Sequence, residues 1–315
     1  IGNRGKLNQL LINQGSGSYV EEVITLPGGA MVTYSMVSAD VNGDGLVDVI
    51  IGNYHGHNQL LMNQGNGKFS TAVDLPGGTL VTFSIAVADV NADGMMDIII
   101  GNTSASNQIL MNEGDGTYSK AIDMPGGIQD TISISAVDIN GDGMVDIIIG
   151  NFSQNNQMLL NDGDGTFSTV IDLPGGRWFT GTISASDING DGMLDILIGN
   201  MDSSNQLLIN QGDGTFSEAI DLPGGIYYTW AILAADLNND GMMDILCGNF
   251  YDQTNQLLIN QDNSGMQFEV ITLPGGALTT GDIVAEDVNE DGMLDILTVN
   301  GEQNQILLNQ GDSRQ

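Results

Sequence analysis

Three recurring phrases in the sequence predict an all-β fold built from one repeated four-stranded unit. An Asp-x-Asn-x-Asp-Gly-x-x-Asp phrase occurs six times, at steps of 49 residues four times and then 51. A Leu/Met-Pro-Gly-Gly phrase also occurs six times, and Asn-Gln followed by apolar residues occurs seven times. Four short strands in a unit of this length are typical of one blade of a β-propeller. The predicted fold class is therefore an all-β β-propeller of four-stranded blades.

The first complete unit contains all four strand signals. Residues 33–39 alternate loosely between polar and apolar. Residues 47–52 are almost all apolar or β-branched, which is typical of a strand buried on both faces. Residues 59–63 give the third strand, and residues 69–75 give the fourth after a Gly-Asn-Gly hairpin signal. No segment has a convincing helical period of apolar residues.

The repeats predict a single domain over residues 1–315 with seven blades, of which the first and the last are incomplete. The repeat bounds are approximately 1–29 (partial), 33–78, 82–127, 131–176, 180–225, 229–276 and 280–315 (partial). Six blades remain the alternative, because merging the two partial repeats into one closing blade leaves one third strand in excess. The sequence begins with Ile1-Gly2-Asn3, which matches the end of a repeat strand. We therefore expect a processed product or a fragment of a longer protein.

The net charge of the chain limits the classes of partner that it can bind. Forty Asp and Glu residues face six Lys and Arg residues, which gives a formal charge of −34. Such a chain repels phosphate backbones and anionic membrane surfaces, so we expect no nucleic acid and no direct membrane insertion. No apolar stretch approaches the ~18 residues of a membrane span. Cations are the natural partners, and the single Cys247 excludes an intramolecular disulfide.

The Asp phrases have the pattern of calcium loops. In the loop 40–48, oxygen-bearing side chains occupy positions 1, 3, 5 and 9, and position 7 can offer its backbone carbonyl. Gly45 at position 6 permits the sharp turn that wraps a chain around an ion. Hard oxygen donors suit Ca²⁺ better than Zn²⁺, which prefers His or Cys. An ion-free Asp/Asn-rich turn is the alternative for one loop, but three carboxylates repeated in six loops would repel one another without a cation.

We therefore expect about six Ca²⁺ ions, each held by five residues of one loop. The predicted ligands are Asp40, Asn42, Asp44, Leu46 and Asp48; Asp89, Asn91, Asp93, Met95 and Asp97; Asp138, Asn140, Asp142, Met144 and Asp146; Asp187, Asn189, Asp191, Met193 and Asp195; Asp236, Asn238, Asp240, Met242 and Asp244; and Asp287, Asn289, Asp291, Met293 and Asp295.

The segment Ala39-Asp40-Val41-Asn42-Gly43-Asp44-Gly45-Leu46-Val47-Asp48-Val49-Ile50-Ile51-Gly52 resembles the FG-GAP/VCBS repeat. That repeat builds the propellers of integrin alpha subunits, certain fungal lectins and many secreted microbial proteins. The resemblance covers essentially the whole chain and implies Ca²⁺ in the loop between the first and second strands of a blade. It also implies an extracellular, secreted or cell-surface location. Two elements depart from the pattern: Phe-Gly becomes Thr33-Tyr34, and Gly-Ala-Pro becomes Gly52-Asn53, so an integrin-like partner does not follow.

The remaining loops vary from repeat to repeat and carry most of the unusual side chains. In a propeller the loops between strands two and three, and between strand four and the next blade, project from the face opposite the Asp loops. Exposed aromatic and Arg side chains on loops commonly mark recognition sites. Filling of the space between blades is the alternative role for these rings. The candidate partner-binding residues are Tyr54, His57, Arg177, Trp178, Tyr228, Trp230 and Tyr251.

Three functions remain open at this point. The first, which we favour, is an extracellular structural or adhesive module that binds a protein or glycan on the variable-loop face, either alone or within a larger assembly. The second is a calcium-dependent lectin, which should show similar pockets in most blades, whereas the aromatic residues gather in a few. The third is a polysaccharide-active enzyme. The sequence has no nucleophile motif and no phosphate loop, so we expect no enzyme activity.

Overall fold

The computed structural model describes residues 2, 5–10, 13–15, 18–19, 24–212, 214–262, 264–301 and 303–311. These residues are all-β and include no helix. They fall into two compact units: unit 1 comprises residues 1–138, 142–151 and 157–172, and unit 2 comprises residues 139–141, 152–156 and 173–315. No helix of membrane-spanning length and apolarity occurs in the described part of the chain.

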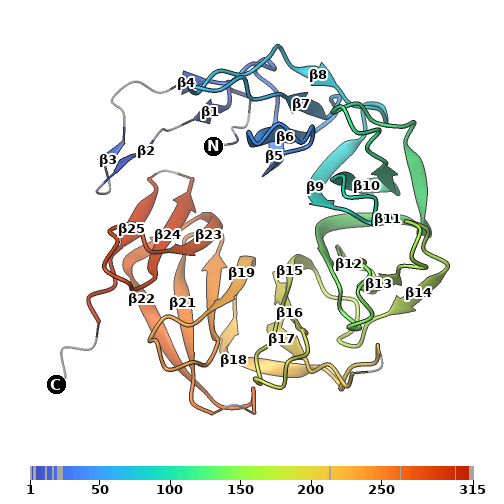
Figure 1. Ribbon diagram of the computed structural model, residues 1–315. Helices are drawn as coiled ribbons and strands as arrows, with labels where there is room; N and C mark the ends of the chain where they lie inside the picture. The colour runs from blue at the N-terminus through green and yellow to red at the C-terminus, as the bar shows by residue number, and fades with distance from the viewer. Residues whose placement is uncertain are drawn as a thin grey trace. The chain divides into compact units, whose positions relative to one another are not determined.

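Unit 1 contains fourteen strands in four sheets (Figure 1). They are β1 (Gln9–Leu10), β2 (Asn13–Gly15), β3 (Ser18–Tyr19), β4 (Ile24–Thr25), β5 (Thr33–Ala39), β6 (Asp48–Asn53), β7 (Gln59–Leu61), β8 (Val73–Asp74), β9 (Val81–Ala88), β10 (Asp97–Leu110), β11 (Ile122–Val137), β12 (Asp146–Asn151), β13 (Gln157–Leu160) and β14 (Thr169–Asp172). β1 pairs with β4 and β2 with β3, β5 to β8 form one antiparallel blade in chain order, and β9 to β14 form a six-stranded sheet.

Two long strands make the six-stranded sheet equivalent to two blades. β10 pairs through residues 97–103 with β9 and through residues 103–109 with the first part of β11. The second part of β11, residues 131–137, then pairs with β12. β10 therefore supplies the second and third strands of one blade, and β11 supplies its fourth strand and the first strand of the next.

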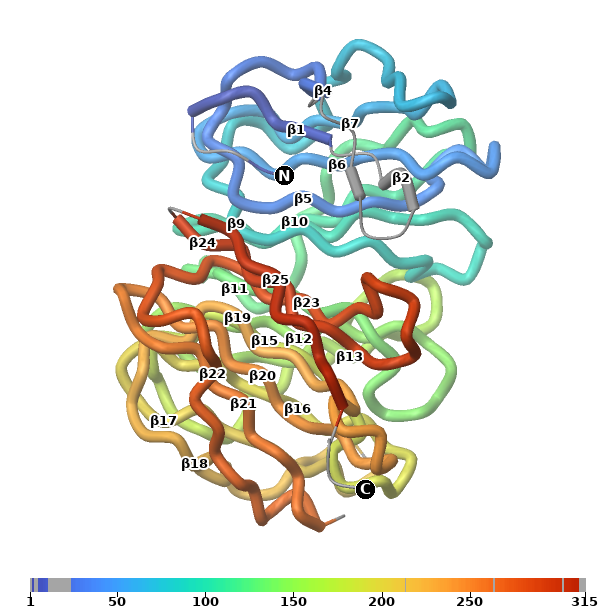
Figure 2. Tube along the Cα trace, turned by 90° about the vertical axis from the view of Figure 1, so that its left-hand side faces the viewer, coloured from blue at the N-terminus to red at the C-terminus, as the bar shows by residue number. Residues whose placement is uncertain are grey.

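Unit 2 contains two complete four-stranded blades and one three-stranded sheet. Its strands are β15 (Thr180–Ser186), β16 (Asp195–Asn200), β17 (Ser204–Leu208), β18 (Ile220–Ile226), β19 (Thr229–Ala235), β20 (Asp244–Asn249), β21 (Gln253–Asn260), β22 (Phe268–Leu278), β23 (Thr280–Glu286), β24 (Asp295–Asn300) and β25 (Gln305–Leu307). Each sheet keeps chain order, and the neighbouring strands β21 and β22 lie side by side in Figures 1 and 2.

The second strand of each complete blade is buried along its whole length. β6, β10 in its first six residues, β12, β16 and β20 share the pattern Asp, four apolar or Gly residues, Asn, and every one of these residues is buried. A strand with side chains on both faces is buried throughout only when other sheets cover both faces. The continuous apolar run in the sequence is therefore the signature of a blade packed between neighbours.

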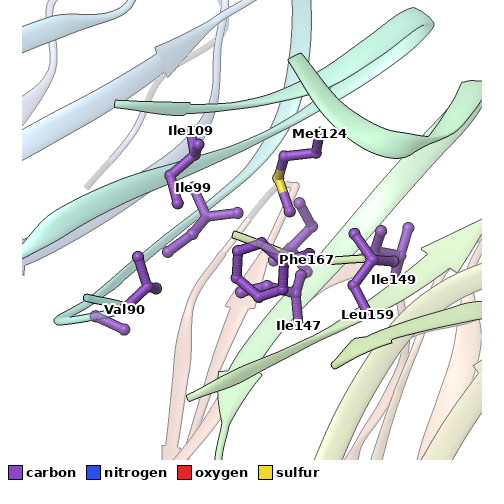
Figure 3. Packing of buried hydrophobic residues seen from close by; sticks show 10 residues of the cluster. Val90, Ile99, Ile109, Met124, Ile147, Ile149, Leu159 and Phe167 are labelled. Atoms are coloured by element: carbon purple, nitrogen blue, oxygen red, sulfur yellow. The ribbon is translucent and has the colours of Figure 1, made fainter. Parts of the chain in front are cut away.

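The core lies between successive blades. In unit 1 one cluster joins Ile99 and Ile109 of β10 to Ile147 and Ile149 of β12, with Phe167 packed against them (Figure 3). Full burial of an aliphatic side chain of this size contributes about 1.5–3 kcal/mol. The repeated isoleucines thus provide the main cohesion of the unit.

Buried hydrogen bonds also join successive blades. Asn58 donates from Nδ2 to Thr82 Oγ1 over 3.0 Å, and Thr82 in turn donates to Asn102 Oδ1 over 3.0 Å. The same Asn–Thr–Asn series recurs in both units, with Asn107, Thr131 and Asn151 in unit 1 and with Asn255, Thr280 and Asn300 in unit 2. The Asn-Gln phrase of one repeat therefore contacts the first strand of the next.

The predicted strands agree with the structure except near the hairpin. The first strand spans 33–39 as predicted, and the second lies one residue later than predicted. The third strand ends at Leu61 rather than Asn63, and the fourth is only Val73–Asp74 rather than 69–75. Ser70 explains the shortening, because its hydroxyl accepts the Met62 N–H that a ladder carbonyl would otherwise take. In all, the described strands form five complete four-stranded blades of a β-propeller; seven blades stay a prediction.

Candidate functional site

Each Asp loop connects the first and second strands of a blade and is organised by its first residue. Asp40 accepts the backbone N–H groups of Gly43 and Asp44 on Oδ1 at 2.8 and 3.2 Å, and that of Gly45 on Oδ2 at 2.8 Å. Gly45 has φ +83°, which other residues rarely adopt. The loop therefore closes tightly around the carboxylate at position 1.

The residues at positions 3 and 5 face each other inside the same loop. Asn42 Oδ1 accepts the Asp44 N–H at 3.0 Å, and Asn42 Nδ2 donates to Asp44 Oδ2 over 3.0 Å. The second Asp44 oxygen accepts the Leu46 N–H at 2.8 Å. The loops that begin at Asp89, Asp187 and Asp236 repeat these contacts with distances of 2.8–3.1 Å.

The aspartate at position 9 is buried and ties the loop to the hairpin between strands three and four. Asp48 has no exposed surface. Its Oδ2 accepts the Val41 N–H at 3.2 Å and its Oδ1 accepts the Asn63 N–H at 2.7 Å. The sequence indicated a metal ligand at this position, but it did not indicate that the same carboxylate accepts a hydrogen bond from the hairpin Asn. The hairpin Asn, 14–16 residues after each ninth-position Asp, is the signal that could have revealed it.

The hairpin Asn also reaches the preceding blade. Asn112 donates from Nδ2 to the carbonyl oxygen of Val41 over 2.8 Å, 71 residues away, as well as to Met96 O over 3.0 Å. Asn161, Asn210, Asn260 and Asn309 make equivalent bonds to the second residue of an earlier Asp loop. Consecutive Asp loops within each unit are thus connected through a buried amide.

Burial makes the ionised ninth-position carboxylate costly. It raises the pKa of Asp48, Asp97 and Asp195, and it raises the pKa of Asp244 to about 6. The two backbone N–H donors lower each of these pKa values without cancelling the effect of burial, and repulsion from the fifth-position carboxylate raises them further. The loop therefore contains more negative charge than its own N–H groups compensate.

The donor chemistry of the loop fits a hard divalent cation. Positions 1, 3, 5 and 9 carry carboxylate or amide oxygens, and position 7 carries a backbone carbonyl, which is the oxygen-only set that Ca²⁺ prefers. Within the described residues no three carboxylate, imidazole or thiol groups converge on one point, because the oxygens of the loop face its own N–H groups. A carboxylate has about four acceptor positions, so these bonds leave lone pairs for an ion.

The predicted partner-binding residues occupy the opposite end of the blades and are mostly exposed. Tyr54, Trp178, Tyr228 and Tyr251 are 39–65% exposed, and His57 and Arg177 are also exposed, whereas Trp230 is half-buried. Within each unit we refer to the end of the blades that carries these residues as the variable end of that unit; it comprises residues 53–58 and 103–106 in unit 1, and residues 152–156, 177–179, 201–204, 227–229 and 250–253 in unit 2.

The structure brings only some of these residues together. In unit 2, Tyr228 contacts Tyr251 with ring centroids 5.0 Å apart, and Phe250 links Tyr251 to Trp230 at 5.0 and 5.5 Å. Tyr54 belongs to a separate group in unit 1, where it contacts Tyr34, which stacks on Phe83 at 4.4 Å. The rings therefore serve both roles considered from the sequence: Trp230 packs, and Tyr251 presents surface.

Tyr251 and the following Asp252 are both held in the left-handed region at φ 54°. Two consecutive non-Gly residues in that region are sterically costly. The loop is fixed by the Asp252 N–H, which donates to Thr279 Oγ1 at 3.3 Å, and by Gln253 Oε1, which accepts the Tyr228 N–H at 2.7 Å. The exposed ring thus stands on a constrained backbone.

Comparison with known proteins identifies the repeat. A family model described as FG-GAP-like repeat matches residues 40–100, 89–149, 138–198 and 187–247. A search of curated protein sequences gave no match.

Several solved structures have a similar fold at low sequence identity. The BP39L lectin from Burkholderia pseudomallei matches with a TM-score of 0.70 and 11% identity over 98% of this chain and 96% of its own. An Agrocybe aegerita lectin, described as recognising non-reducing terminal N-acetylglucosamine, matches with a TM-score of 0.60 and 21% identity over 85% and 74%. BBS1N in complex with ARL6DN matches with a TM-score of 0.63 and 12% identity over 98% and 94%. At these identities the likeness concerns the fold alone.

Proposed function

Because the chain belongs to the FG-GAP-like repeat family, we propose that it is a calcium-binding β-propeller that acts as an interaction module. The observation that carries the proposal is the sixfold Asp loop. Each copy places three carboxylates, one amide oxygen and one carbonyl within nine residues. Burial, together with repulsion from neighbouring carboxylates, raises the pKa values of Asp48, Asp97, Asp195 and Asp244, and a bound cation would stabilise their ionised forms.

In this proposal each of the six loops holds one Ca²⁺ through positions 1, 3, 5, 7 and 9. The ion would supply the positive charge that the loop lacks, and positions 1 and 9 would hold it between the loop and the hairpin. Extracellular calcium modules bind with dissociation constants of about 10⁻⁴–10⁻³ M, which suits an exposed loop outside the cell. We therefore propose an extracellular or cell-surface location.

The interaction surface would lie at the variable end of each unit. Exposed aromatic anchors at Tyr54, Trp178, Tyr228 and Tyr251 support this assignment, since large rings on constrained loops bind with little loss of conformational entropy. The ligand would be a protein or a glycan, and the module would act in adhesion or as part of a larger assembly. We propose no catalytic role; a screen for polysaccharide cleavage tests that point.

A lectin function is the second candidate, and one observation favours it. In unit 1 a hollow at a blade-to-blade junction is lined by Ile109, Met111 and Ile122 on one side and by Gly165, Thr166 and Phe167 on the other. Asp123 is the one acidic residue in its lining. Apolar surface with a few polar groups is typical of a small-molecule site, and two proteins of similar fold are lectins.

Removal of calcium tests the proposal. We expect metal-free protein to melt at a markedly lower temperature than calcium-loaded protein, because an ion that binds only the folded state stabilises it by mass action. Added Ca²⁺ should restore the melting temperature, and Mg²⁺ at the same concentration serves as the control. A melt that does not change between metal-free and calcium-loaded protein would rule out structural calcium. A glycan array probed with and without calcium then separates the lectin from the protein-binding module.

A further inference from the structure

Arg177 is an unusual residue because it is a cation with no carboxylate partner among the residues that the structure describes. The sequence has 40 acidic residues, yet within the described part of the chain Arg177 forms no ion pair. Its one hydrogen bond there runs from Nε to Asn155 Oδ1 over 3.2 Å. The side chain is exposed at the variable end of unit 2. An arginine held through Nε presents its two terminal nitrogens, Nη1 and Nη2, to solvent as a pair.

The neighbouring Trp178 offers a flat apolar surface next to this pair. Trp178 is 43% exposed, and its carbonyl oxygen accepts the Ser153 N–H at 3.0 Å. Gly176 has φ +88°, and a Cβ at that position would lie 3.4 Å from the indole Nε1. The indole therefore lies close to the backbone of the turn that carries it, and the positive φ favours glycine at position 176.

The backbone under both side chains is constrained. Phe152 stacks on Phe179 with ring centroids 4.3 Å apart and an interplanar angle of 9°, and the two residues form an isolated β-bridge. Ser153 is held at φ 60°. The loop 152–156 and the turn 176–179 thus form one fixed surface, in which Arg177 and Trp178 come from one segment and Asn155 from the other.

We propose that the surface formed by Asn155, Arg177 and Trp178 binds a uronic acid residue of a glycan. The carboxylate would accept two hydrogen bonds from Nη1 and Nη2, the geometry in which a guanidinium matches a carboxylate. The C–H face of the sugar ring would stack on the indole, whose amphipathic ring suits a ligand that is apolar on one face and polar on its edge. This assignment rests on the proposed binding role and names its ligand class.

Charge selects the acidic sugar over a neutral one. The guanidinium gains two parallel hydrogen bonds and the attraction of an opposite charge from a carboxylate, whereas a hydroxyl of a neutral sugar offers a single uncharged acceptor. The negative charge of the rest of the chain opposes an anionic ligand at long range. At 0.15 M salt that repulsion is screened beyond about 8 Å, whereas a contact with Arg177 is screened much less.

The test compares two probes that differ only in the carboxyl group. Methyl glucuronide and methyl glucoside are titrated into the full, calcium-loaded chain at 0.15 M salt, with binding followed by calorimetry. We expect the glucuronide to bind about tenfold more tightly or better, and Arg177→Gln to abolish that difference. Trp178→Ala should weaken both sugars. Lys68→Gln, which removes one positive charge from a hairpin at the Asp-loop end, is the matched control and should leave both affinities unchanged.

Melting temperature and bound calcium are measured on every variant, so that loss of binding is separated from loss of fold. Equal affinity of the two sugars in the native chain, or a preference that persists in Arg177→Gln, would overturn the proposal. Arg177-dependent binding of a short acidic peptide without binding of the glucuronide would also overturn it, in favour of a protein partner. If a glycan array finds another ligand while the glucuronide does not bind, the proposed module stands and only this site is wrong.

Discussion

Asp244 illustrates how one residue can couple the fold to the ion. Both of its oxygens accept backbone N–H groups, from Leu237 at 3.1 Å and from Asn260 at 2.9 Å, and it has no exposed surface. Burial nevertheless raises its pKa to about 6. The carboxyl is therefore needed for its hydrogen bonds but is poorly stabilised in its ionised form unless a cation lies nearby.

This coupling predicts an inverted pH dependence in the metal-free protein. The pKa of Asp244 is about 6 in the folded state against 3.8 for an ordinary Asp, so the folded state binds the proton more tightly. Its contribution to the free energy of unfolding is greatest below the lower value and is lost as pH rises through about 6. Asp48, Asp97 and Asp195 shift in the same direction.

The measurement is the melting temperature of metal-free protein at pH 5.0 and pH 7.5. We expect the higher value at pH 5.0, and we expect saturating Ca²⁺ to reverse the order because the ion binds the ionised loop. Asp115 is a useful control, since hydrogen bonds from Thr117 lower the pKa of its exposed carboxyl, so Asp115→Asn should not remove the trend. A metal-free protein that is more stable at pH 7.5 would contradict this account.

The second prediction at the residue scale concerns Asp187, the proposed calcium ligand at position 1 of its loop. Asp187 accepts three loop N–H groups, from Gly190, Asp191 and Gly192, at 2.7–3.1 Å. Asp187→Ala removes a proposed ligand and leaves these donors to water. We expect about one of the six ions to be lost by elemental analysis, with a modest drop in melting temperature. The control is Asp221→Ala, outside the loops; unchanged calcium in Asp187→Ala would mean that this loop binds none.

At the scale of the strand and the hairpin, the side-chain amide of the hairpin Asn forms a hydrogen bond to the preceding blade in some repeats but, within the described ranges, not in the first complete one. Asn112 Nδ2 donates both to Met96 of its own blade and to Val41 of the preceding one. Asn63 occupies the same hairpin position, but among the described residues its Nδ2 donates only to Val47 of its own blade, over 2.9 Å. The two Asn residues also hold the next hairpin Gly in the same way, at 2.9 Å. They form a matched pair that differs in the contact between blades.

We therefore expect Asn112→Ala to destabilise the protein by about 2 kcal/mol more than Asn63→Ala, because a buried carbonyl left without a donor costs about 1–3 kcal/mol. Urea unfolding of both variants at saturating calcium measures the difference. Equal losses in the two variants would show that the bond to Val41 adds nothing to stability.

Much of each strand follows from the sequence, and the exceptions have local causes. Residues 33–39 and the buried second strand are specified by side-chain pattern alone, so the prediction was close. In the first complete unit the predicted fourth strand, residues 69–75, ends just before the proline of the Leu-Pro-Gly-Gly phrase. In the following blade β11 continues through Pro125 of the corresponding phrase, with a register shift between Ser106 and Gln108 of its partner strand β10. Such a bulge depends on the neighbouring strand, which a single sequence does not display.

Some features of the candidate site could also be predicted from the sequence, whereas others required the structure. The spacing within nine residues is enough to predict the oxygen donors of the Asp loop, because every donor is local. The buried bonds of Asp48 to Asn63, and of Asn112 to Val41, join residues 15 and 71 positions apart and arise only from the packing of blades. The pairings of Tyr228 with Tyr251 in unit 2 and of Tyr54 with Tyr34 in unit 1 likewise required the structure.

At the scale of the whole molecule, the formal charge is itself a source of instability. A charge of −34 with six basic residues produces self-repulsion that favours expanded states. Six bound Ca²⁺ would bring the formal charge to about −22 and would place the added positive charge where carboxylates are most crowded. Calcium should then stabilise the folded state in two ways: by ligation within each loop and by lowering the net negative charge of the whole molecule.

The last prediction separates these two actions by salt. Sodium chloride screens exposed charges with a Debye length of about 10 Å at 0.1 M and about 3 Å at 1 M, but it does not coordinate the loops in place of Ca²⁺. We expect the melting temperature of metal-free protein to rise steeply between 20 and 500 mM NaCl and that of calcium-saturated protein to rise less. Even at 500 mM the metal-free protein should melt below the calcium-saturated one, because screening cannot supply loop ligation. If the melting temperatures of the two forms rose equally with salt, calcium would not act through the net charge of the molecule. If the two melting temperatures became equal at high salt, calcium would stabilise the protein by screening alone.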